Sequence, residues 1–222
     1  MSESLVECVG LARTYGRGQT AVVAVEAVTC AVGRAARIAL TGSSGSGKST
    51  LLHLFAALDE PTAGSIVWPA WQSSPASRPG LVGVVFQGPS LLTPLDVAEN
   101  VALPLLLAGV EPEEARTRAV KAMDRAGVAD LALKLPEELS GGQAQRVAVA
   151  RVLATEPQLI LADEPTGQLD ASHRDQVVDL LIEAADALQA GLVIATHDRR
   201  VADRLGSRWT MNDGRLEGEF SC

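Results

Sequence analysis

The sequence has few aromatic residues and no long apolar run. Phe, Trp and Tyr together account for 3% of the 222 residues, whereas hydrophobic residues account for 47%. Alanine, valine and leucine must therefore supply most of the packing, and a disordered chain is excluded. No apolar stretch approaches the roughly 18–20 residues that a membrane-spanning helix needs. The longest, residues 101–110, is short and contains Pro104. We expect a chain that is soluble by itself and reaches a membrane only through a partner.

Cysteine and basic residues are also scarce. The three cysteines, Cys8, Cys30 and Cys222, are odd in number, far apart and without the spacing of metal ligands. They indicate reduced thiols in a cytosolic protein. The opening residues are acidic and interrupted, so no secretory signal is predicted. The formal net charge of −8 argues against nucleic acid as a partner, because nucleic-acid-binding domains usually carry a basic surface.

The pattern along the chain predicts an α/β protein with room for a substantial core. Short β-like runs occur first, at residues 4–9 and 21–32. Four further runs are typical of strands, and they lie at residues 37–41, 81–86, 158–163 and 191–197. Helical patterns follow the first and third of these, over residues 48–57 and 171–190. Strands that alternate with helices predict a parallel sheet with helices on both faces.

A mainly helical block, residues 96–155, interrupts this alternation and indicates an insertion into the α/β core. One helix has clear start and stop signals: Pro112, Glu113 and Glu114 suit a first turn, and Gly127 suits the end. Residues 68–80, WPAWQSSPASRPG, are rich in proline and serine and predict a loop.

The stretch GSSGSGKST, residues 42–50, fits the phosphate-binding pattern G-x-x-x-x-G-K-[ST]. Glycines allow successive N–H groups to turn inward around a phosphate, and the following helix adds the positive end of its dipole. Lys48 can reach the β- and γ-phosphates, and Ser49 can bind Mg²⁺. A predicted strand before the loop and a predicted helix after it provide the context that this motif requires.

Acidic and imidazole side chains follow the next two predicted strands. Asp163 ends the run QLILAD, at the strand edge where open α/β sheets bind ligands. It can hold Mg²⁺, and the adjacent Glu164 can take a proton from an attacking water. An Asp-Glu pair in a turn is ordinarily solvated, but here an apolar strand delivers it to the site. His197 ends GLVIATH, and the residues alone leave open whether it is structural or contacts the γ-phosphate. His53 and His173 receive no role.

A second glycine turn, LSGGQAQR, occupies residues 139–146. Ser140 is a good helix N-cap, and Gly141 and Gly142 allow close backbone approach to an anion. On the residues alone, an ordinary capped helix is the favoured interpretation.

Together these motifs resemble the ATP-binding subunit of an ATP-binding-cassette (ABC) transporter. GSSGSGKST resembles the Walker A motif, LILADE resembles Walker B, and LSGGQ resembles the family signature. VVFQ carries Gln87 at the glutamine position, PTGQLD carries Asp170, ATHD carries His197 at the switch position, and Tyr15 matches the aromatic residue that stacks on adenine. The motifs follow the order of the family and cover nearly the whole chain.

The resemblance implies a single ABC ATP-binding domain over residues 1–222. It implies a P-loop NTPase (RecA-like) core, an N-terminal antiparallel β subdomain and an inserted α-helical subdomain at about residues 90–155. ATP and Mg²⁺ are the implied ligands. The implied catalytic residues are Glu164, His197 and Gln87, and the implied metal ligands are Ser49, Gln87 and Asp163. The implied nucleotide-binding residues are Tyr15, Gly42, Ser43, Ser44, Gly45, Ser46, Gly47, Lys48, Ser49, Thr50, Ser140, Gly141, Gly142, Gln143 and Asp170.

The resemblance also explains the second glycine turn. In such proteins two ATP-binding subunits pack head to tail, and the signature of one caps the nucleotide on the Walker A motif of the other. It implies a homodimer that works with a polytopic membrane permease at the inner face of the cell membrane. The stretches after residues 84 and 146 look like those of lipoprotein-releasing and macrolide-exporter ATPases. The short segment 68–80, Ala144 and Gln168 depart from the usual family pattern without replacing a phosphate-contacting residue.

Several alternatives remain at this stage. Leu91, Leu92 and residues 103–107 form either a groove for a permease helix or, by the favoured interpretation, the core of the helical block with one or two members exposed at the groove. A soluble ABC ATPase acting on ribosomes or DNA, or an ATP-dependent clamp without a permease, is the second hypothesis for function. A nucleotide kinase is disfavoured, because LSGGQ would then have no task.

Overall fold

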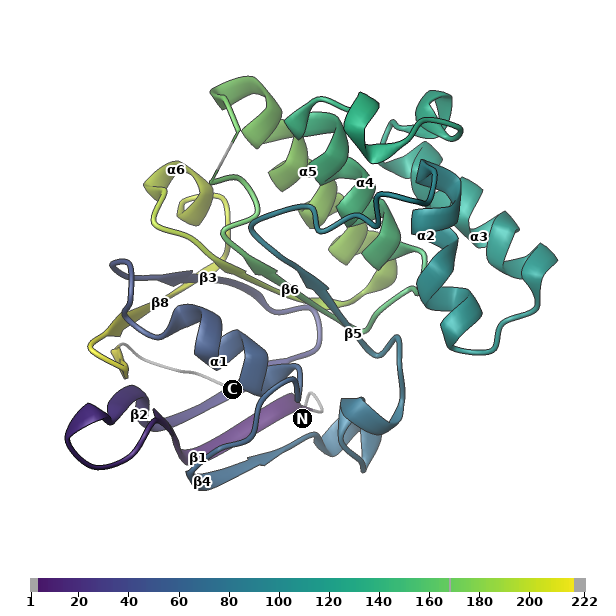
Figure 1. The fold of residues 1–222 in the computed structure, drawn as a ribbon. Coiled ribbons are helices and arrows are strands. Elements are labelled where there is room, and N and C mark those ends of the chain that lie inside the picture. Colours follow the sequence, from purple (N-terminus) through teal and green to yellow (C-terminus); the bar gives the residue numbers. More distant parts are fainter. Residues whose placement is uncertain (1–3, 168, 218–222) are drawn as a thin grey trace.

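The computed structural model describes residues 4–167 and 169–217, so Gln168 and Cys222 lie outside the described residues. Two sheets form the framework (Figure 1). The smaller is antiparallel and has the order β2 (Val22–Gly33), β1 (Ser4–Tyr15), β4 (Ala63–Val67). The larger has the order β5 (Val82–Val85), β6 (Leu159–Asp163), β7 (Gly191–Ala195), β3 (Arg37–Thr41), β8 (Ser207–Asn212), β9 (Arg215–Glu217). Its first five strands are parallel, and only β9 runs antiparallel to its neighbour.

Helices cover both faces of the larger sheet, as predicted (Figure 1). Helix α1 (Lys48–Phe55) lies between the two sheets, while α4 (Gly141–Leu153) and α5 (Ala171–Leu188) cover the opposite face. Helices α2 (Val97–Leu107) and α3 (Pro112–Arg125) pack on each other and on α4, at the β5 side of the sheet. The short α6 (Arg199–Ala202) follows β7. No helix among the described residues is long and apolar enough to cross a membrane.

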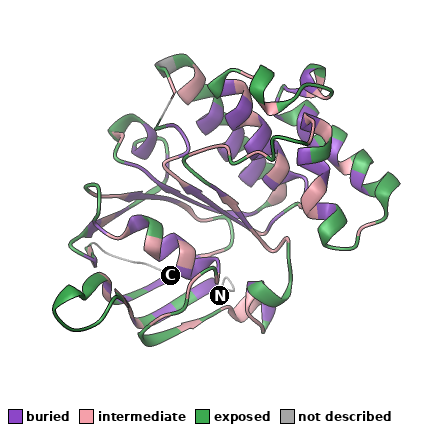
Figure 2. Ribbon diagram, viewed as in Figure 1, coloured by how far each residue is buried: buried purple, intermediate pink, exposed green. Residues whose placement is uncertain are grey.

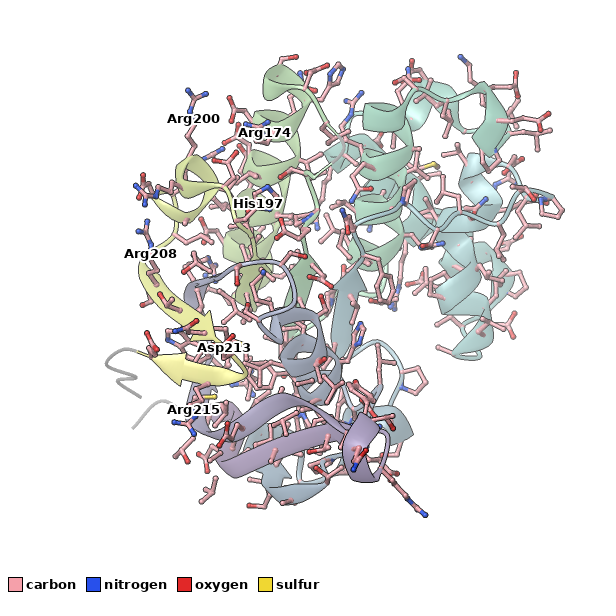
Figure 3. All side chains as sticks on the ribbon, turned by 60° about the vertical axis from the view of Figure 1, so that its left-hand side comes forward. Arg174, His197, Arg200, Arg208, Asp213 and Arg215 are labelled. Atoms are coloured by element: carbon pink, nitrogen blue, oxygen red, sulfur yellow. The ribbon has the colours of Figure 1, made fainter. Side chains whose placement is uncertain are left out.

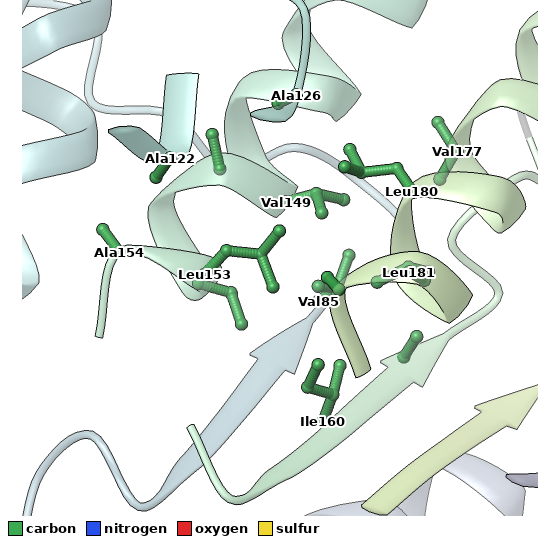
Figure 4. Packing of buried hydrophobic residues seen from close by; sticks show 14 of the residues in the cluster. Val85, Ala122, Ala126, Val149, Leu153, Ala154, Ile160, Val177, Leu180 and Leu181 are labelled. Carbon is green, nitrogen blue, oxygen red and sulfur yellow. The ribbon is translucent and has the colours of Figure 1, made fainter. Parts of the chain in front are cut away.

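The central strands are buried on both faces because their successive side chains enter two different cores. Ile160 and Ala162 of β6 point to the core under α4 and α5, whereas Leu159 and Leu161 join the core around α1 and the smaller sheet. Figure 4 shows Ile160 below Leu181 and Val149, and Figure 2 shows the central strands as a buried band. The apolar runs that predicted β6 and β7 therefore reflect burial on both faces: α4 and α5 cover one face of the larger sheet, and α1 and the smaller sheet cover the other.

The helix boundaries follow the signals read in the sequence. Pro112 begins α3, and Gly127 follows its end with a φ of 61°. Asp96 caps α2 in a capping box with Glu99.

Cys8 and Cys30 are opposite each other on β1 and β2 and are buried free thiols.

The segment 68–80 is a loop, as predicted, but it is well packed. It contains two short 3-10 helices, Pro69–Trp71 and Pro75–Ser77, and the side chain of Trp71 is buried. The indole Nε1 of Trp71 donates to Oε1 of Gln158 at 2.9 Å, and Nε1 of Trp68 donates to the carbonyl of Phe55 at 3.0 Å. Two indole hydrogen bonds and the burial of Trp71 attach this loop to the core.

The leucines after Gln87 divide between the two alternatives. Leu105 is buried in the core, and Leu91 packs partly against it. Leu92, Leu106 and Leu107 are exposed by 46%, 43% and 79%. Three of the six leucines are thus exposed, one more than the core interpretation expected, and only Leu105 is fully in the core.

Buried Asn100 organises the segment that leads into α2. Its side chain is fully buried, and Oδ1 accepts from the N–H of Leu92 at 2.8 Å. Its Nδ2 donates to three carbonyls, those of Leu92, Leu95 and Asp96, at 2.9–3.1 Å. One amide therefore satisfies the polar backbone of a turn that has few partners of its own.

Asn100→Ala is expected to destabilise the protein by about 2–3 kcal/mol, because it leaves buried backbone groups without partners. Urea unfolding followed by circular dichroism measures this change. Lys121→Ala, at an exposed position of the adjacent helix α3, is the control and should change stability by less than about 0.5 kcal/mol. Equal stabilities of the two variants would contradict the role given to Asn100.

Candidate functional site

The glycine loop between β3 and α1 is pressed against two other parts of the chain. Gly42 and Gly47 have φ angles of 151° and 102°. A Cβ on Gly42 would lie 2.3 Å from the carbonyl oxygen of Met211, and one on Gly47 would lie 2.0 Å from that of Ala24. Glycine is thus required at both positions by conformation and by space. This loop is the predicted phosphate-binding motif, in the predicted position after a strand and before a helix.

Lys48 lies inside this loop. Its side chain is almost fully buried, and its ammonium donates to the carbonyls of Gly42 and Ser43, both at 2.9 Å. Nζ is 3.9 Å from Oε1 of Glu164. A buried ammonium held by two carbonyls and one carboxylate is a cation directed at the interior of the loop, where a phosphate would provide stronger acceptors.

A cleft of about 550 Å³ opens beside the loop. Most of the predicted Walker A, Walker B, glutamine and switch residues line it, together with Ala24. The lining consists of Ala24, Ser44, Gly45, Gly47, Lys48, Ser49, Thr50, Gln87, Asp163, Glu164 and His197. The parallel sheet explains this convergence, because the carboxyl ends of β3, β5, β6 and β7 meet at one edge.

The two carboxylates at the end of β6 have different surroundings. Oδ1 of Asp163 is buried and has no hydrogen-bond partner within the described chain. Glu164 has the positive φ of 46°, and its N–H donates to the carbonyl of Ala195 at 2.9 Å. Its Oε2 lies 3.0 Å from Nδ1 of His197. This local backbone turn places the glutamate between Lys48 and the histidine.

His197 is positioned by the loop that joins β7 to α6 (Figure 3). Its side chain is 69% exposed. The adjacent Asp198 forms an ion pair of 2.8 Å with Arg174 of α5, and its N–H donates to the hydroxyl of Thr196 at 3.0 Å. These contacts fix the loop while leaving the imidazole accessible from the cleft.

The residues predicted as metal ligands fit a magnesium ion. Ser49, Gln87 and Asp163 line the same cleft, and they offer the hard oxygen donors that Mg²⁺ prefers. The unpartnered Oδ1 of Asp163 provides a carboxylate oxygen that a cation would satisfy. No group of three or more His, Cys, Asp and Glu side chains in the described chain could hold a metal, so the remaining ligands would be phosphates and water.

Helix α4 supports the backbone around Gln87, a feature that the sequence analysis missed. Gln145 is buried, and its Nε2 donates to the carbonyl of Phe86 at 3.1 Å. The guanidinium of Arg151 donates to the carbonyls of Ser90 and Pro89 at 2.9 and 3.2 Å, and burial lowers the pKa of Arg151. Polar residues among apolar ones on α4 were the available signal, but their partners are distant in sequence.

The second glycine turn lies outside the cleft of its own chain. Ser140 caps α4 in a capping box: its Oγ accepts from the N–H of Gln143, and Oε1 of Gln143 accepts from the N–H of Ser140. None of residues 140–143 lines the cleft. The predicted contact of Ser140, Gly141, Gly142 and Gln143 with nucleotide therefore has no counterpart within one chain.

Two further predicted nucleotide contacts also lie outside this cleft. Tyr15 donates to Oδ2 of Asp59 at 2.6 Å, and the guanidinium of Arg13 lies 4.6 Å from its ring centroid. Asp170 caps α5, and its pKa is lowered by hydrogen bonds from the His173 N–H, the Ser172 hydroxyl and the His173 side chain. In this chain Tyr15 and Asp170 are engaged with their own neighbours.

The parallel sheet, the glycine loop and the carboxylates at its edge define the class of nucleotide-hydrolysing phosphate-loop proteins. A family model described as ABC transporter matches residues 25–167, more than half of the chain. The chain belongs to this family. It is an ABC cassette ATPase, and the predicted fold of core, antiparallel sheet and helices is confirmed.

Solved structures agree. One is the dimeric structure of MJ0796, a bacterial ABC transporter cassette. Its sequence is 32% identical to this chain, the TM-score is 0.85, and the match covers 96% of this chain and 97% of that chain. Its dimeric post-hydrolysis state with ADP and Pi is 33% identical with a TM-score of 0.84, over the same shares. CbiO1 from Clostridium perfringens, part of the transporter complex cbiONQ, is 29% identical with a TM-score of 0.85, over 97% of this chain and 88% of that chain.

Asp163→Asn is expected to raise the Mg²⁺ concentration for half-maximal ATP turnover by at least roughly tenfold, because an amide is a weaker ligand than a carboxylate. ATPase rates over a Mg²⁺ titration measure this shift. Asp213→Asn, at an exposed carboxylate on the turn between β8 and β9 (Figure 3), is the matched control and should leave the titration unchanged. The assignment of Asp163 fails if both variants behave alike.

Proposed function

We propose that this ATPase works as a head-to-tail homodimer that drives a membrane permease, with Mg²⁺ bound beside the nucleotide. The main support is that the cleft residues and the second glycine turn lie apart in one chain. Lys48, Glu164 and His197 meet in one cleft, whereas the capped glycine turn at residues 140–143 lies outside it. A turn with free N–H groups at a helix start suits a phosphate, and a second chain can bring it to the nucleotide. The dimeric cassette with ADP and Pi, about one third identical, supports this arrangement.

Each residue of the cleft has a task in hydrolysis. The ammonium of Lys48 leaves its loop carbonyls to bind the β- and γ-phosphates, and the loop N–H groups surround the same charge. Glu164 accepts a proton from the attacking water. The imidazole of His197, 3.0 Å from Glu164, orients that water or contacts the γ-phosphate. Ser49, Asp163 and Gln87 would hold Mg²⁺, which would neutralise part of the charge of the phosphates.

Closure and opening of the proposed dimer drive the conformational change of the permease. A nucleotide in one cleft gains additional N–H donors when the partner's glycine turn covers it, so ATP favours the closed pair. Hydrolysis and loss of the γ-phosphate remove those contacts. Gln87 senses this change, and α4 transmits it because Gln145 holds the carbonyl next to Gln87 while the start of α4 carries the glycine turn.

The permease is proposed to bind where Leu92, Leu106 and Leu107 are exposed. These leucines follow Gln87 in the chain and belong to the turn before α2 and to α2 itself. By resemblance, the partner is of the lipoprotein-releasing or macrolide-exporter type, for export or for transmembrane mechanical signalling. The chain would then be peripheral at the cytoplasmic face of the membrane, without a nucleic-acid partner. CbiO1, a structural neighbour, is part of a transporter complex.

Glu164→Gln is expected to lower ATP turnover at least roughly 100-fold, because the amide cannot accept the proton of water. ATP affinity should stay within about threefold, since the carboxylate is 3.9 Å from Lys48 and has no role in holding phosphate. The variant should form a dimer in Mg-ATP by size-exclusion chromatography with light scattering. Glu183→Gln, an exposed carboxylate on α5, is the control. An unchanged ATPase rate would reject Glu164 as the base.

A pull-down with the Glu164→Gln variant in Mg-ATP is expected to capture a polytopic membrane protein from membranes of the source cells. Leu107→Asp in the same bait should reduce this capture at least roughly fivefold by placing a charge on an apolar contact. Val22→Asp is the control, at an apolar position of the smaller sheet that is 62% exposed, against 79% for Leu107. Mass spectrometry identifies the captured proteins. Capture of soluble proteins alone would favour the soluble ATPase or clamp hypothesis.

A further inference from the structure

His173 covers a glycine of the second turn, although it lies about thirty residues further along the chain. A Cβ built on Gly142 would lie 2.6 Å from Cδ2 and 2.9 Å from Cγ of His173. Gly142 has an ordinary helical backbone, so its φ angle does not demand glycine. What limits a side chain there is the imidazole ring of His173, which occupies the space that a Cβ of residue 142 would need.

Asp170 holds the ring in this place. Oδ2 of Asp170 is 2.7 Å from Nδ1 of His173, and Oδ1 accepts from the N–H of His173 at 3.0 Å and from the hydroxyl of Ser172 at 2.8 Å. An ionised carboxylate can only accept, so the proton of this contact is on Nδ1. The low pKa of Asp170 keeps the carboxylate ionised at neutral pH. The rotamer and tautomer of His173 are thus set by the cap of α5.

These contacts join the starts of two helices. The start of α4 carries the glycine turn, and the start of α5 carries Asp170 and follows directly on the loop after Glu164. Neither His173 nor Asp170 lines the chain's own nucleotide cleft. The side chain of His173 is 42% exposed, so it does not serve as core packing.

We propose that His173 is a positioning residue that ties the start of α5 to Gly142, so that both helix starts meet the partner's nucleotide as one rigid unit. This inference rests on the proposed dimer. By fixing the glycine turn before the pair closes, the tie lowers the ordering cost of closure. It acts through the backbone of Gly142 and not on the nucleotide in its own cleft. The effect therefore belongs to dimer closure and not to the binding of nucleotide by one chain.

Three substitutions in the Glu164→Gln background separate this role from simple filling of space. His173→Ala removes both contacts. His173→Phe keeps a ring over Gly142 but cannot donate to Asp170. Gln176→Ala, at an exposed position one turn further along α5, is the control.

Two quantities are measured for each protein. The ATP concentration for half-maximal dimer formation comes from analytical ultracentrifugation, and the affinity for ADP, which by the proposal does not close the pair, comes from calorimetry. We expect His173→Ala and His173→Phe each to raise the first quantity roughly five- to tenfold, corresponding to the loss of one net hydrogen bond. ADP affinity should stay within about twofold, because the cleft residues are untouched.

The outcomes are separable. If His173→Ala closes as readily as its parent, or if His173→Phe does, the tie to Asp170 is not required and the inference is overturned. A parallel loss of ADP affinity would place the effect in the chain's own cleft and would also overturn it. If the Glu164→Gln parent forms no dimer in ATP, the proposed function fails and this inference fails with it.

Discussion

The close approach of the phosphate loop to two other parts of the chain is the constraint on which the structure depends. Gly47 leaves no room for a side chain because the carbonyl of Ala24 lies against it, and Gly42 is limited in the same way by Met211. Ala24 belongs to the smaller sheet and Met211 to the larger one. The N–H of Gly214 also donates to the carbonyl of Ser46 at 3.1 Å. The loop thus packs between the two sheets, and backbone atoms of both sheets limit its shape.

Helix α4 is the second organising element. Its start presents the glycine turn to the outside of the chain, and its middle holds the carbonyls around Gln87 through Gln145 and Arg151. Its apolar side packs in the core with α5 (Figure 4). A single helix therefore connects the glycine turn, which we propose meets a partner, with the backbone beside Gln87, which we propose responds to the γ-phosphate. This geometry gives a physical basis for coupling between closure and the cleft.

The electrostatics of the cleft depend on local pairing and not on the net charge of −8. Lys48 is enclosed by two carbonyls and approached by Glu164, and Glu164 in turn contacts His197. The buried ammonium of Lys48 and the N–H groups of the glycine loop provide the local positive charge that suits a polyanion, although the net charge of the chain is negative. Asp170, by contrast, is fully engaged by its own helix, and its influence on a neighbouring chain would pass through His173.

Much of the fold could be predicted because its signals are local or periodic. Strand β3 has the predicted bounds, and β5, β6, β7 and α3 agree within a few residues, since buried strands read as apolar runs and helix ends carry Pro, Gly and capping residues. Residues 68–80 form the predicted loop, but their attachment to the core was not predicted because the partners of Trp68 and Trp71 lie elsewhere in the chain. Composition does not contain that information.

The sequence by itself determined the class of chemistry. The glycine loop with Lys48, the carboxylates after an apolar strand and the capped second turn each need only a few consecutive residues, and parallel-strand topology brings their ends together. Other contacts appear only in the folded chain: Gln145 and Arg151 bind the backbone near Gln87, Trp71 is buried with Trp68 packed against the core, and His173 lies over Gly142. These contacts join residues that are dozens of positions apart. They depend on distances and angles between side chain and backbone that arise only when the chain has folded.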